Sequence, residues 1–360
     1  MAEENLDGVR RRIREIDGQI LGLAAERQRL AREVGEIKRR LGIATVDYAQ
    51  ERAVLERARA TATERGLEPS IAEDLLARLI RASVNAQDQD SIRFSAAGAG
   101  QSAVVVGGEG RMGRWMRQFL SAGGFRVASI DPTAPADAQA EGRAALPQAD
   151  LVLCCTPPAA TAQLYMEWTA APPKGVVTDI ASIKTPLVPA IRRLQASGAR
   201  VASIHPMFGP SIALLRDADV VLCDTGDAAA LDAVERLFHP TTARLVRMPL
   251  EEHDRHMADL LSLAHATAIA FALALPERKH PVRSTTFGAL ERLAAAVVRE
   301  SPDVYFEIQS RNPHSFVALE RLRAAVDRVM HAVAAGDAAG FAALMRDGEA
   351  RTGAEPAPGA

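Results

Sequence analysis

An apolar seam along the first predicted helix constrains what the start of this 360-residue chain can fold into. Its members recur at alternating spacings of three and four residues over five repeats, the pattern of a helix packed against other helices. They are Leu6, Val9, Ile13, Ile16, Ile20, Leu23, Arg27, Leu30, Val34, Ile37 and Leu41. Arg27 is the one charged member, and a charge there is costly unless an anion meets it. The seam therefore predicts either a coiled-coil dimer with a specificity arginine in its core or a helical site for an anion.

Two further cations of this helix bear on that choice. Lys38 follows Arg27 by eleven residues, which returns to within about 20° of the same helix face. Both side chains are therefore expected to reach one cavity. Arg10 lies about 100° away from Arg27 around the helix, so it would reach a different cavity, such as one that belongs to a second protomer.

Polar residues also stand at particular positions on the next two predicted helices. Asp47 suits an N-cap with Gln50 as its capping-box partner, and Glu51 lies one turn after Asp47. Ser83 and Gln87 lie on one face of the third helix. Each feature also has a simpler explanation, because the first pair can serve as caps alone and polar pairs on helices are usually exposed.

Over residues 5–90, these positions together resemble the all-helical class of chorismate mutase, without a gap. The resemblance implies an intertwined helical dimer in which one arginine of each active site comes from the partner subunit. It implies catalytic roles for Arg10 (from the partner), Arg27, Lys38, Glu51 and Gln87, and substrate contacts from Asp47 and Ser83. The rearrangement of chorismate to prephenate is pericyclic, so catalysis means clamping two carboxylates and stabilising charge on the ether oxygen. One departure is Gln50, where the family commonly has arginine.

A glycine-rich turn opens the middle of the chain. Gly108, Gly110 and Gly113 form G-x-G-x-x-G between an apolar strand and a helix, the context that this otherwise weak motif requires. We expect them to permit the tight turn, the approach of a pyrophosphate and close helix packing, in that order. Asp131 ends the next apolar strand, where an acidic residue binds the ribose hydroxyls and favours NAD over NADP. The same NAD site is expected to include Arg111, Met112 and Thr156. The alternative is a Rossmann-like domain that binds no nucleotide.

Short apolar runs then alternate with helix-like segments, which predicts a parallel α/β sheet. Ser182 and His205 each follow such a run, so both are expected at the carboxyl edge of the sheet, where ligands bind. Because Pro206 follows it, His205 is expected in a turn, where a lone histidine is more often structural than catalytic. His253 and His256 have no evident third ligand, so no metal site is expected.

The segments VVVGGEGRMG, DIASIK, HPMFGP and EEHD followed by HATAIAFAL resemble prephenate dehydrogenase in order and spacing. With the N-terminal segment, the chain to about residue 350 resembles the bifunctional chorismate mutase–prephenate dehydrogenase family. The resemblance implies that His205 accepts the proton of the substrate's ring hydroxyl as hydride leaves the same carbon. It further implies that Ser182 orients the histidine or the hydroxyl, and that His265 lies near the substrate.

The substrate-binding arginine of the dehydrogenase half departs from the family pattern. The family brings an arginine from the region STTFGALERLAAAVVRESPD onto a substrate carboxylate. The aromatic-arginine step reads Phe287-Gly288 here, and a second arginine position reads Ala296. Arg292, one turn earlier, is expected to take over, whereas Arg299 is less well placed.

Three functions remain open on these residues. The first is the bifunctional enzyme of tyrosine biosynthesis, with chorismate and prephenate as substrates. The second is a paralogue that acts on their 4-amino-4-deoxy analogues in specialised metabolism, since Gln50 and the shifted arginine both lie where substrate is held. The third is a protein whose modules are inactive and sense ligands or bind partners, and the intact cations and glycine turn argue against it.

Composition and charge argue against several classes of protein. The net charge of −2 favours neither nucleic acid nor an anionic membrane as a partner. No apolar run approaches the roughly 20 residues of a membrane helix, and the N-terminus lacks the apolar stretch of a secretory signal. Cys154, Cys155 and Cys223 lack a metal-ligand spacing, and adjacent cysteines rarely pair. We therefore expect a reduced, cytoplasmic compartment, and the seam of the first helix suggests a homodimer.

The expected fold class is multidomain, with an α/β domain between two all-α domains. We expect a helical chorismate mutase domain over 1–92, a linker over 93–101, an α/β Rossmann NAD-binding domain over 102–249, an all-α C-terminal dimerisation domain over 250–350 and a disordered tail over 351–360.

Overall fold

The structure is a computed structural model that describes residues 2–43, 46–212, 215–216, 218–277 and 281–353. The chain forms two compact units. One comprises residues 1–181 and 189–250, and the other comprises residues 182–188 and 251–360. The expected multidomain class is confirmed, because helices, a parallel sheet and further helices follow one another along the chain.

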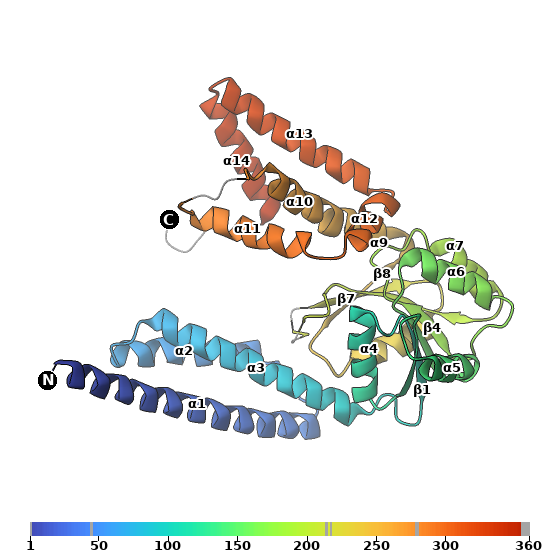
Figure 1. Ribbon diagram of the computed structural model, residues 1–360, viewed down its shortest axis with the longest axis horizontal. Helices are drawn as coiled ribbons and strands as arrows, with labels where there is room; N and C mark the ends of the chain where they lie inside the picture. The colour runs from blue at the N-terminus through green and yellow to red at the C-terminus, as the bar shows by residue number, and fades with distance from the viewer. Residues whose placement is uncertain (1, 44–45, 213–214, 217, 278–280, 354–360) are drawn as a thin grey trace. The chain divides into compact units, whose positions relative to one another are not determined.

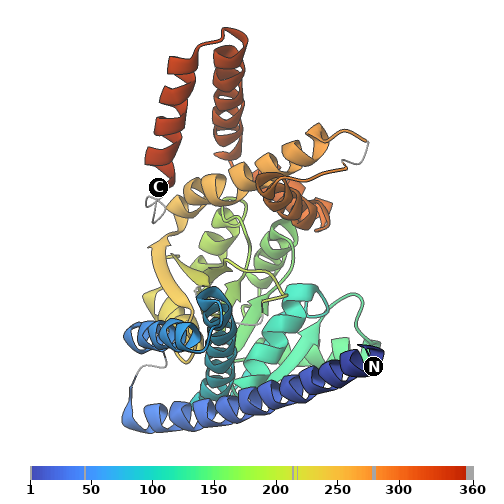
Figure 2. The same cartoon turned by 90° about the vertical axis from the view of Figure 1, so that its left-hand side faces the viewer.

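Three helices begin the first unit and lie side by side (Figures 1 and 2). They are α1 (Ala2–Leu41), α2 (Tyr48–Glu64) and α3 (Pro69–Ser95). The Asp47 carboxylate caps α2 by accepting a hydrogen bond from the backbone amide of Gln50 at 2.9 Å, as expected for an N-cap. Pro69 occupies the first turn of α3, where its missing amide hydrogen costs nothing. Because α3 ends at Ser95, the helix extends into the segment expected to be a linker.

The apolar seam of α1 faces away from the other two helices. Its ten apolar members each expose between 41% and 67% of their surface. By contrast, Ala24, Gln28 and Gly35 on the flank of the helix are half-buried or buried, because α3 packs there. A strip of this length in water is unfavourable, and a single chain leaves it uncovered.

A five-stranded parallel sheet follows, with the order β2-β1-β3-β4-β5. Its strands are β1 (Ser102–Val106), β2 (Arg126–Ile130), β3 (Leu151–Cys154), β4 (Val176–Asp179) and β5 (Arg200–Val201). The connecting helices are α4 (Arg111–Ala122), α5 (Ala136–Ala145), α6 (Pro158–Trp168) and α7 (Val188–Ala196), with a 3-10 turn, η1 (Leu146–Gln148), after α5. The strands β1, β3 and β4 are almost entirely buried, as expected for parallel strands covered on both faces.

A second sheet, of three strands, completes the unit. It contains β6 (Ser203–Pro206), β7 (Asp219–Asp224) and β8 (Arg244–Pro249), with α8 (Ala228–Phe238) after β7. The run ARVASIHP, expected to be one parallel strand, is divided at Ala202 between β5 and β6. Since β6 runs antiparallel to β7, the expected all-parallel sheet is wrong for this segment. Rings from α4 and α8 pack beside it, with Phe119 stacked on Phe238 at 5.0 Å between centroids.

Helices make up most of the second unit. They are α9 (Leu250–Met257), a π-helical segment η2 (Ala258–Leu263), α10 (Ala264–Ala274), α11 (Thr285–Val298), α12 (Pro302–Arg311), α13 (Ser315–Ala334) and α14 (Ala338–Thr352). The expected C-terminal helices are therefore confirmed. Because α14 ends at Thr352, it takes in the first two residues of the expected tail, and residues 354–360 lie outside the described part of the chain.

One stretch of this unit departs from the expectation of no membrane-length segment. Within the described residues, Leu250–Ala274 is long and apolar enough to cross a membrane by length and composition, and 22% of its most apolar window is buried. The sequence expectation was wrong on this count, because single polar residues such as Asp259 interrupt the run without lowering its average hydropathy enough. Core helices of soluble proteins can have the same length and composition.

Candidate active sites

A cluster of polar side chains joins α1 to α3 at Arg27. The Arg27 guanidinium donates to the Ser83 hydroxyl at 3.0 Å, and that hydroxyl lies 2.9 Å from the Gln28 side-chain oxygen. Burial lowers the pKa of Arg27. Ser83 is buried, so the sequence argument that such helical polar residues are usually exposed fails here. Arg27 therefore lies at the junction of two helices and not in the middle of the exposed seam.

Gln87 is the second polar group of this junction. Its side-chain amide donates to the backbone carbonyl of Ala31 on α1. A Cβ atom on Gly35 would lie 2.7 Å from Gln87 Cγ, so a glycine there allows the glutamine to pack against the helix backbone. Lys38, half-buried one turn further along, lies on the same flank. The structure thus brings Arg27, Gln87 and Lys38 to one side of α1.

Arg10 lies far from this group within the same chain. Seventeen residues separate it from Arg27, about 26 Å along a helix, which is beyond the reach of its side chain. It pairs only loosely with Asp7 at 3.6 Å, and both side chains are largely exposed. Arg10 could therefore contribute to a site of this kind only in another copy of the chain, which remains a prediction.

Glu51 makes a contact that the sequence did not suggest. Its two carboxylate oxygens accept hydrogen bonds from the two terminal nitrogens of Arg216, at 3.0 and 2.6 Å. Arg216 follows β6 and precedes β7, 165 residues further along the chain. No local pattern marks Arg216, since it follows a glycine- and proline-containing loop and belongs to no periodic run.

The glycine turn between β1 and α4 has the geometry of a phosphate cradle. The positive φ of the turn, +79°, is at Gly107, one residue before the motif, so Gly108 is not the residue that permits the turn. A Cβ atom on Gly108 would instead lie 2.2 Å from Ser129 Oγ, and one on Gly113 would lie 2.0 Å from the Gly107 carbonyl oxygen. Gly110 is the N-cap of α4, so the helix amides after it are open to an anion.

Asp131 lies directly after β2 and beside this turn. It is buried, and its carboxylate accepts hydrogen bonds from the backbone amides of Glu109 and Thr133 at 3.0 and 2.9 Å, and from the Thr133 hydroxyl at 2.7 Å. Burial opposes ionisation, but these hydrogen bonds outweigh it and lower the pKa of Asp131. An ionised carboxylate at the end of the second strand fits the ribose of NAD and repels a 2′-phosphate.

The other expected cofactor residues lie at the same edge of the sheet. Arg111 and Met112 form the first turn of α4, and Thr156 follows β3 with its hydroxyl 2.8 Å from Thr161 Oγ1. Glu109, an unexpected acid in a phosphate turn, is paired with Arg117 on α4. This ion pair removes much of the repulsion that Glu109 would exert on a pyrophosphate. The residues present therefore fit a dinucleotide.

His205 is buried inside a strand, not in the turn expected for it. It exposes 4% of its surface and pairs with Val221 of β7. The sequence argument relied on Pro206, which lacks the amide hydrogen of a central strand. However, β6 is an edge strand and Pro206 is its last residue, a position where proline is tolerated.

The segment after β4, which carries Ser182, is held by Asp254 of α9. The Asp254 carboxylate accepts hydrogen bonds from the backbone amides of Lys184 and Thr185, each at 2.7 Å, and it lies 2.8 Å from His253 Nδ1. Burial opposes its ionisation, but the hydrogen bonds from His253 and Thr185 outweigh that cost and lower the pKa of Asp254 to about 2. The EEHD segment is visible in the sequence, but its spacing does not predict this contact.

His265 follows the π-helical segment and packs on Tyr305 of α12, with ring centroids 4.2 Å apart. Burial lowers the pKa of His265. Its Nδ1 atom is buried without a hydrogen-bond partner among the described residues. A neutral ring with an unused nitrogen suits a ligand contact, and π-bulges occur often at functional sites. Arg292 and Ala296 lie exposed on α11, and the exposed Arg299 directly follows the helix.

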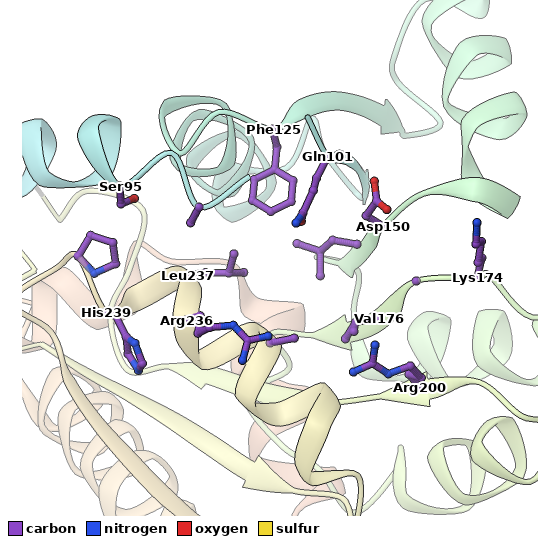
Figure 3. A pocket seen from close by; sticks show the side chains of 15 residues that line it. Ser95, Gln101, Phe125, Asp150, Lys174, Val176, Arg200, Arg236, Leu237 and His239 are labelled. Atoms are coloured by element: carbon purple, nitrogen blue, oxygen red, sulfur yellow. The ribbon is translucent and has the colours of Figure 1, made fainter. Parts of the chain in front are cut away.

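A separate cavity of 590 Å³ lies at the opposite edge of the parallel sheet, at the amino ends of β3, β4 and β5. Figure 3 shows Arg200 and Arg236 there with Phe125 and Leu237. It contains none of the residues that the sequence assigned to a site. The described residues hold no group of three or more His, Cys, Asp and Glu side chains that could bind a metal.

Comparisons with known proteins agree with this arrangement. Residues 9–88 match the family "Chorismate mutase type II", and residues 134–247 match "Prephenate dehydrogenase, nucleotide-binding domain". The T-protein of Enterobacter agglomerans is 30% identical over 272 residues, covering 76% of this chain and 71% of that protein. The 4-amino-4-deoxyprephenate dehydrogenase of Streptomyces pristinaespiralis is 30% identical over 264 residues, covering 68% and 88%. The crystal structure of prephenate dehydrogenase from A. aeolicus with hydroxyphenyl propionate and NAD+ has a TM-score of 0.56, 18% identity, and covers 70% of this chain and 97% of that one.

Proposed function

The chain belongs to the bifunctional chorismate mutase–prephenate dehydrogenase family, and from that premise we propose how its residues divide the two reactions. It is an enzyme of tyrosine biosynthesis that rearranges chorismate to prephenate and converts prephenate to 4-hydroxyphenylpyruvate with NAD. The observation that carries this conclusion is the presence of both domains in one chain with a T-protein relative that it matches over most of its length.

We propose that the mutase site lies along the junction of α1 and α3. Chorismate carries two carboxylates, and Arg27 offers a guanidinium that can bind one of them bidentately. Arg10 of a second copy would bind the other, while Lys38 and Gln87 donate to the ether oxygen that becomes negative in the transition state. Glu51 would accept a hydrogen bond from the ring hydroxyl, and Asp47 and Ser83 would lie beside the substrate.

The same assignment requires a homodimer, which we propose forms through α1. Its ten exposed apolar residues provide a continuous strip for a second copy, and packing such a strip removes apolar surface from water at about 25 cal/mol per Å². In such a dimer, Arg10 of the partner subunit would reach the site at Arg27, which Arg10 of the same chain is too far away to reach. Size-exclusion chromatography with light scattering, with Ile13→Glu as the disrupting variant, tests the dimer and its link to mutase activity.

For the oxidation, the turn between β1 and α4 would hold the pyrophosphate of NAD, which when bound would supply the hydride acceptor. We propose that His205 accepts the proton of the ring hydroxyl and that Ser182 orients the reacting groups. His205 is buried in β6, with 4% of its surface exposed. Loss of the ring carboxylate as CO₂ then yields an aromatic ring, which makes the reaction irreversible. His265 and Arg292 would bind the substrate, and the exposure of Arg292 leaves its guanidinium open to a carboxylate.

A second candidate substrate class is the 4-amino-4-deoxy analogues. It is favoured by Gln50, the shifted arginine and the match to 88% of a relative named 4-amino-4-deoxyprephenate dehydrogenase. The ordinary substrates are better supported, because the T-protein relative matches across both modules.

We propose a cytoplasmic location and the domain boundaries 1–92, 102–249 and 250–350. None of the three cysteines forms a disulfide in the described part of the chain, as in a reducing compartment. The apolar stretch Leu250–Ala274 bonds to neighbouring helices of its own unit through Asp254 and Ser262, which suits a helix of a soluble domain better than one in lipid.

One assay tests the whole proposal. Purified full-length protein receives chorismate and NAD, and chorismate loss and NADH formation are followed together. Both should proceed at enzymatic rates. Chorismate loss without NADH would give the dehydrogenase another substrate. Faster turnover of the amino analogues than of chorismate and prephenate would favour the second candidate.

A further inference from the structure

The contact between Glu51 and Arg216 joins the helical module to the nucleotide-binding module. The two terminal nitrogens of the guanidinium face the two carboxylate oxygens, at 3.0 and 2.6 Å. This two-point geometry defines the carboxylate plane as well as its position, because both partners are planar. The guanidinium also lies 5.3 Å from the centroid of the Tyr48 ring, on the first residue of α2.

The pair is shielded from water, unlike ion pairs on the helix surfaces. Arg216 exposes 12% of its side chain and Glu51 exposes 19%. The pairs Arg12–Glu15 and Arg29–Glu33 on α1 leave more than half of every side chain exposed. Exposed pairs contribute little, whereas partial burial weakens competition from water and strengthens a pair that is already formed. The Glu51 carboxylate therefore has one favoured orientation in this structure.

A second polar contact joins the same modules beside the other end of the proposed mutase site. Asp88 follows Gln87 on α3, is buried, and accepts hydrogen bonds from the backbone amide and hydroxyl of Thr242, before β8. The nucleotide-binding module thus contacts α2 at Glu51 and α3 next to Gln87. Both contacts come from segments that lead into strands of its three-stranded sheet, Arg216 before β7 and Thr242 before β8, and β6 of that sheet carries His205.

We propose that Arg216 is a positioning residue for the mutase reaction, which it affects by holding the Glu51 carboxylate in the orientation that meets the substrate's ring hydroxyl. The inference rests on the proposed role of Glu51. The residue before Glu51 is Gln50, an uncharged side chain, so α2 itself places no cation immediately before this carboxylate. The chain supplies one from the dehydrogenase half instead, which makes the mutase site dependent on a residue outside the mutase module.

The test compares variants of the full-length enzyme in the separate mutase and dehydrogenase assays. Arg216→Ala should lower mutase kcat/KM by about tenfold or more, which corresponds to about 1.4 kcal/mol, while NADH formation from prephenate stays within about twofold of the parent. Arg216→Lys keeps the charge but loses the two-point geometry. Its mutase kcat/KM should lie between those of Arg216→Ala and the parent enzyme. The matched control is Arg244→Ala, which removes a two-point arginine–carboxylate pair with Asp219 in the same sheet and should change neither activity.

A double-mutant cycle separates positioning from a general structural effect. Glu51→Ala combined with Arg216→Ala should be no slower in the mutase reaction than Glu51→Ala alone, because the arginine acts only through the glutamate. Additive losses, or a mutase unaffected by Arg216→Ala, would overturn the proposal. The proposal would also be overturned if Arg216→Ala lost both activities equally and had a lower melting temperature, while a well-folded Arg216→Lys showed no mutase defect. A parent enzyme without mutase activity would instead refute the proposed function itself.

Discussion

The close approach of α4 to the glycine turn gives the sharpest prediction, for Gly113→Ala. A Cβ atom there would lie 2.0 Å from the Gly107 carbonyl oxygen and 2.8 Å from Gly108 Cα. Ordinary contact begins at 3.4 Å, so the carbonyl would have to retreat by 1.4 Å (3.4 minus 2.0). Both obstacles are backbone atoms, which cannot rotate away as a side chain would. The turn itself must therefore move.

That displacement affects the part of the molecule that would hold a pyrophosphate. A hydrogen bond to a charged group contributes about 1.5–3 kcal/mol, and a shift of this size breaks hydrogen bonds from the turn and the first amides of α4. The loss of two such bonds corresponds to about 3–6 kcal/mol, or a rise of about 10² to 10⁴ in the dissociation constant of NAD. The mutase reaction uses none of these groups and should keep its parent rate.

Calorimetric titration with NAD measures this effect directly, and NADH formation from prephenate confirms it. The matched control is Gly123→Ala at the other end of α4, where the Cβ atom would meet only Leu120 O at 3.4 Å and Phe119 O at 3.6 Å. This control should bind NAD normally and be no less stable, because alanine restricts the unfolded chain. Parent-like NAD affinity in Gly113→Ala would refute the argument that the contact between helix and turn forms the site.

The remaining predictions concern one residue in each reaction and one in the C-terminal unit. Arg27→Ala should lower mutase kcat/KM by about a hundredfold, through lost charge-assisted hydrogen bonds, with prephenate oxidation unchanged; loss of both activities would show that the sites are not separate. His205→Asn should stop prephenate oxidation but not NAD binding, and surviving turnover would remove its role as base. Asp254 has a pKa lowered to about 2, so its ionised form stabilises the fold above pH 3.8. The free energy of unfolding should fall by about 2 kcal/mol as the pH falls towards 2. Asp254→Asn should lower the melting temperature at pH 7 more than at pH 2.5, and an equal effect at both would contradict this.

The shared flank of Arg27 and Lys38 on α1 could be predicted from the sequence because it depends on helical periodicity. The spacing of Arg27 and Lys38 places them on one flank of α1 whatever the rest of the chain does. The burial of Ser83 could not be predicted in this way. It follows from the packing of α3 on α1, where Ser83 meets Arg27 and Gln28. On the same flank Gly35 allows Gln87 to pack closely, although from the sequence a glycine in a helix looks only like a weak position.

The sequence by itself determined the parts of this protein that short-range geometry controls. The helices, the glycine turn with Asp131 after the next strand, and the order of the domains all follow from spacings of a few residues, because backbone hydrogen bonds and side-chain periods act locally.

Only the tertiary structure decided which distant groups meet. It placed His205 in an edge strand antiparallel to β7, bonded Asp254 to the segment after β4, and brought Arg216 to Glu51 across 165 residues. Each of these contacts depends on how loops close and sheets pack. Polar pairs of this kind become strong only when the folded unit excludes water around them, and a local sequence pattern does not show where water will be excluded.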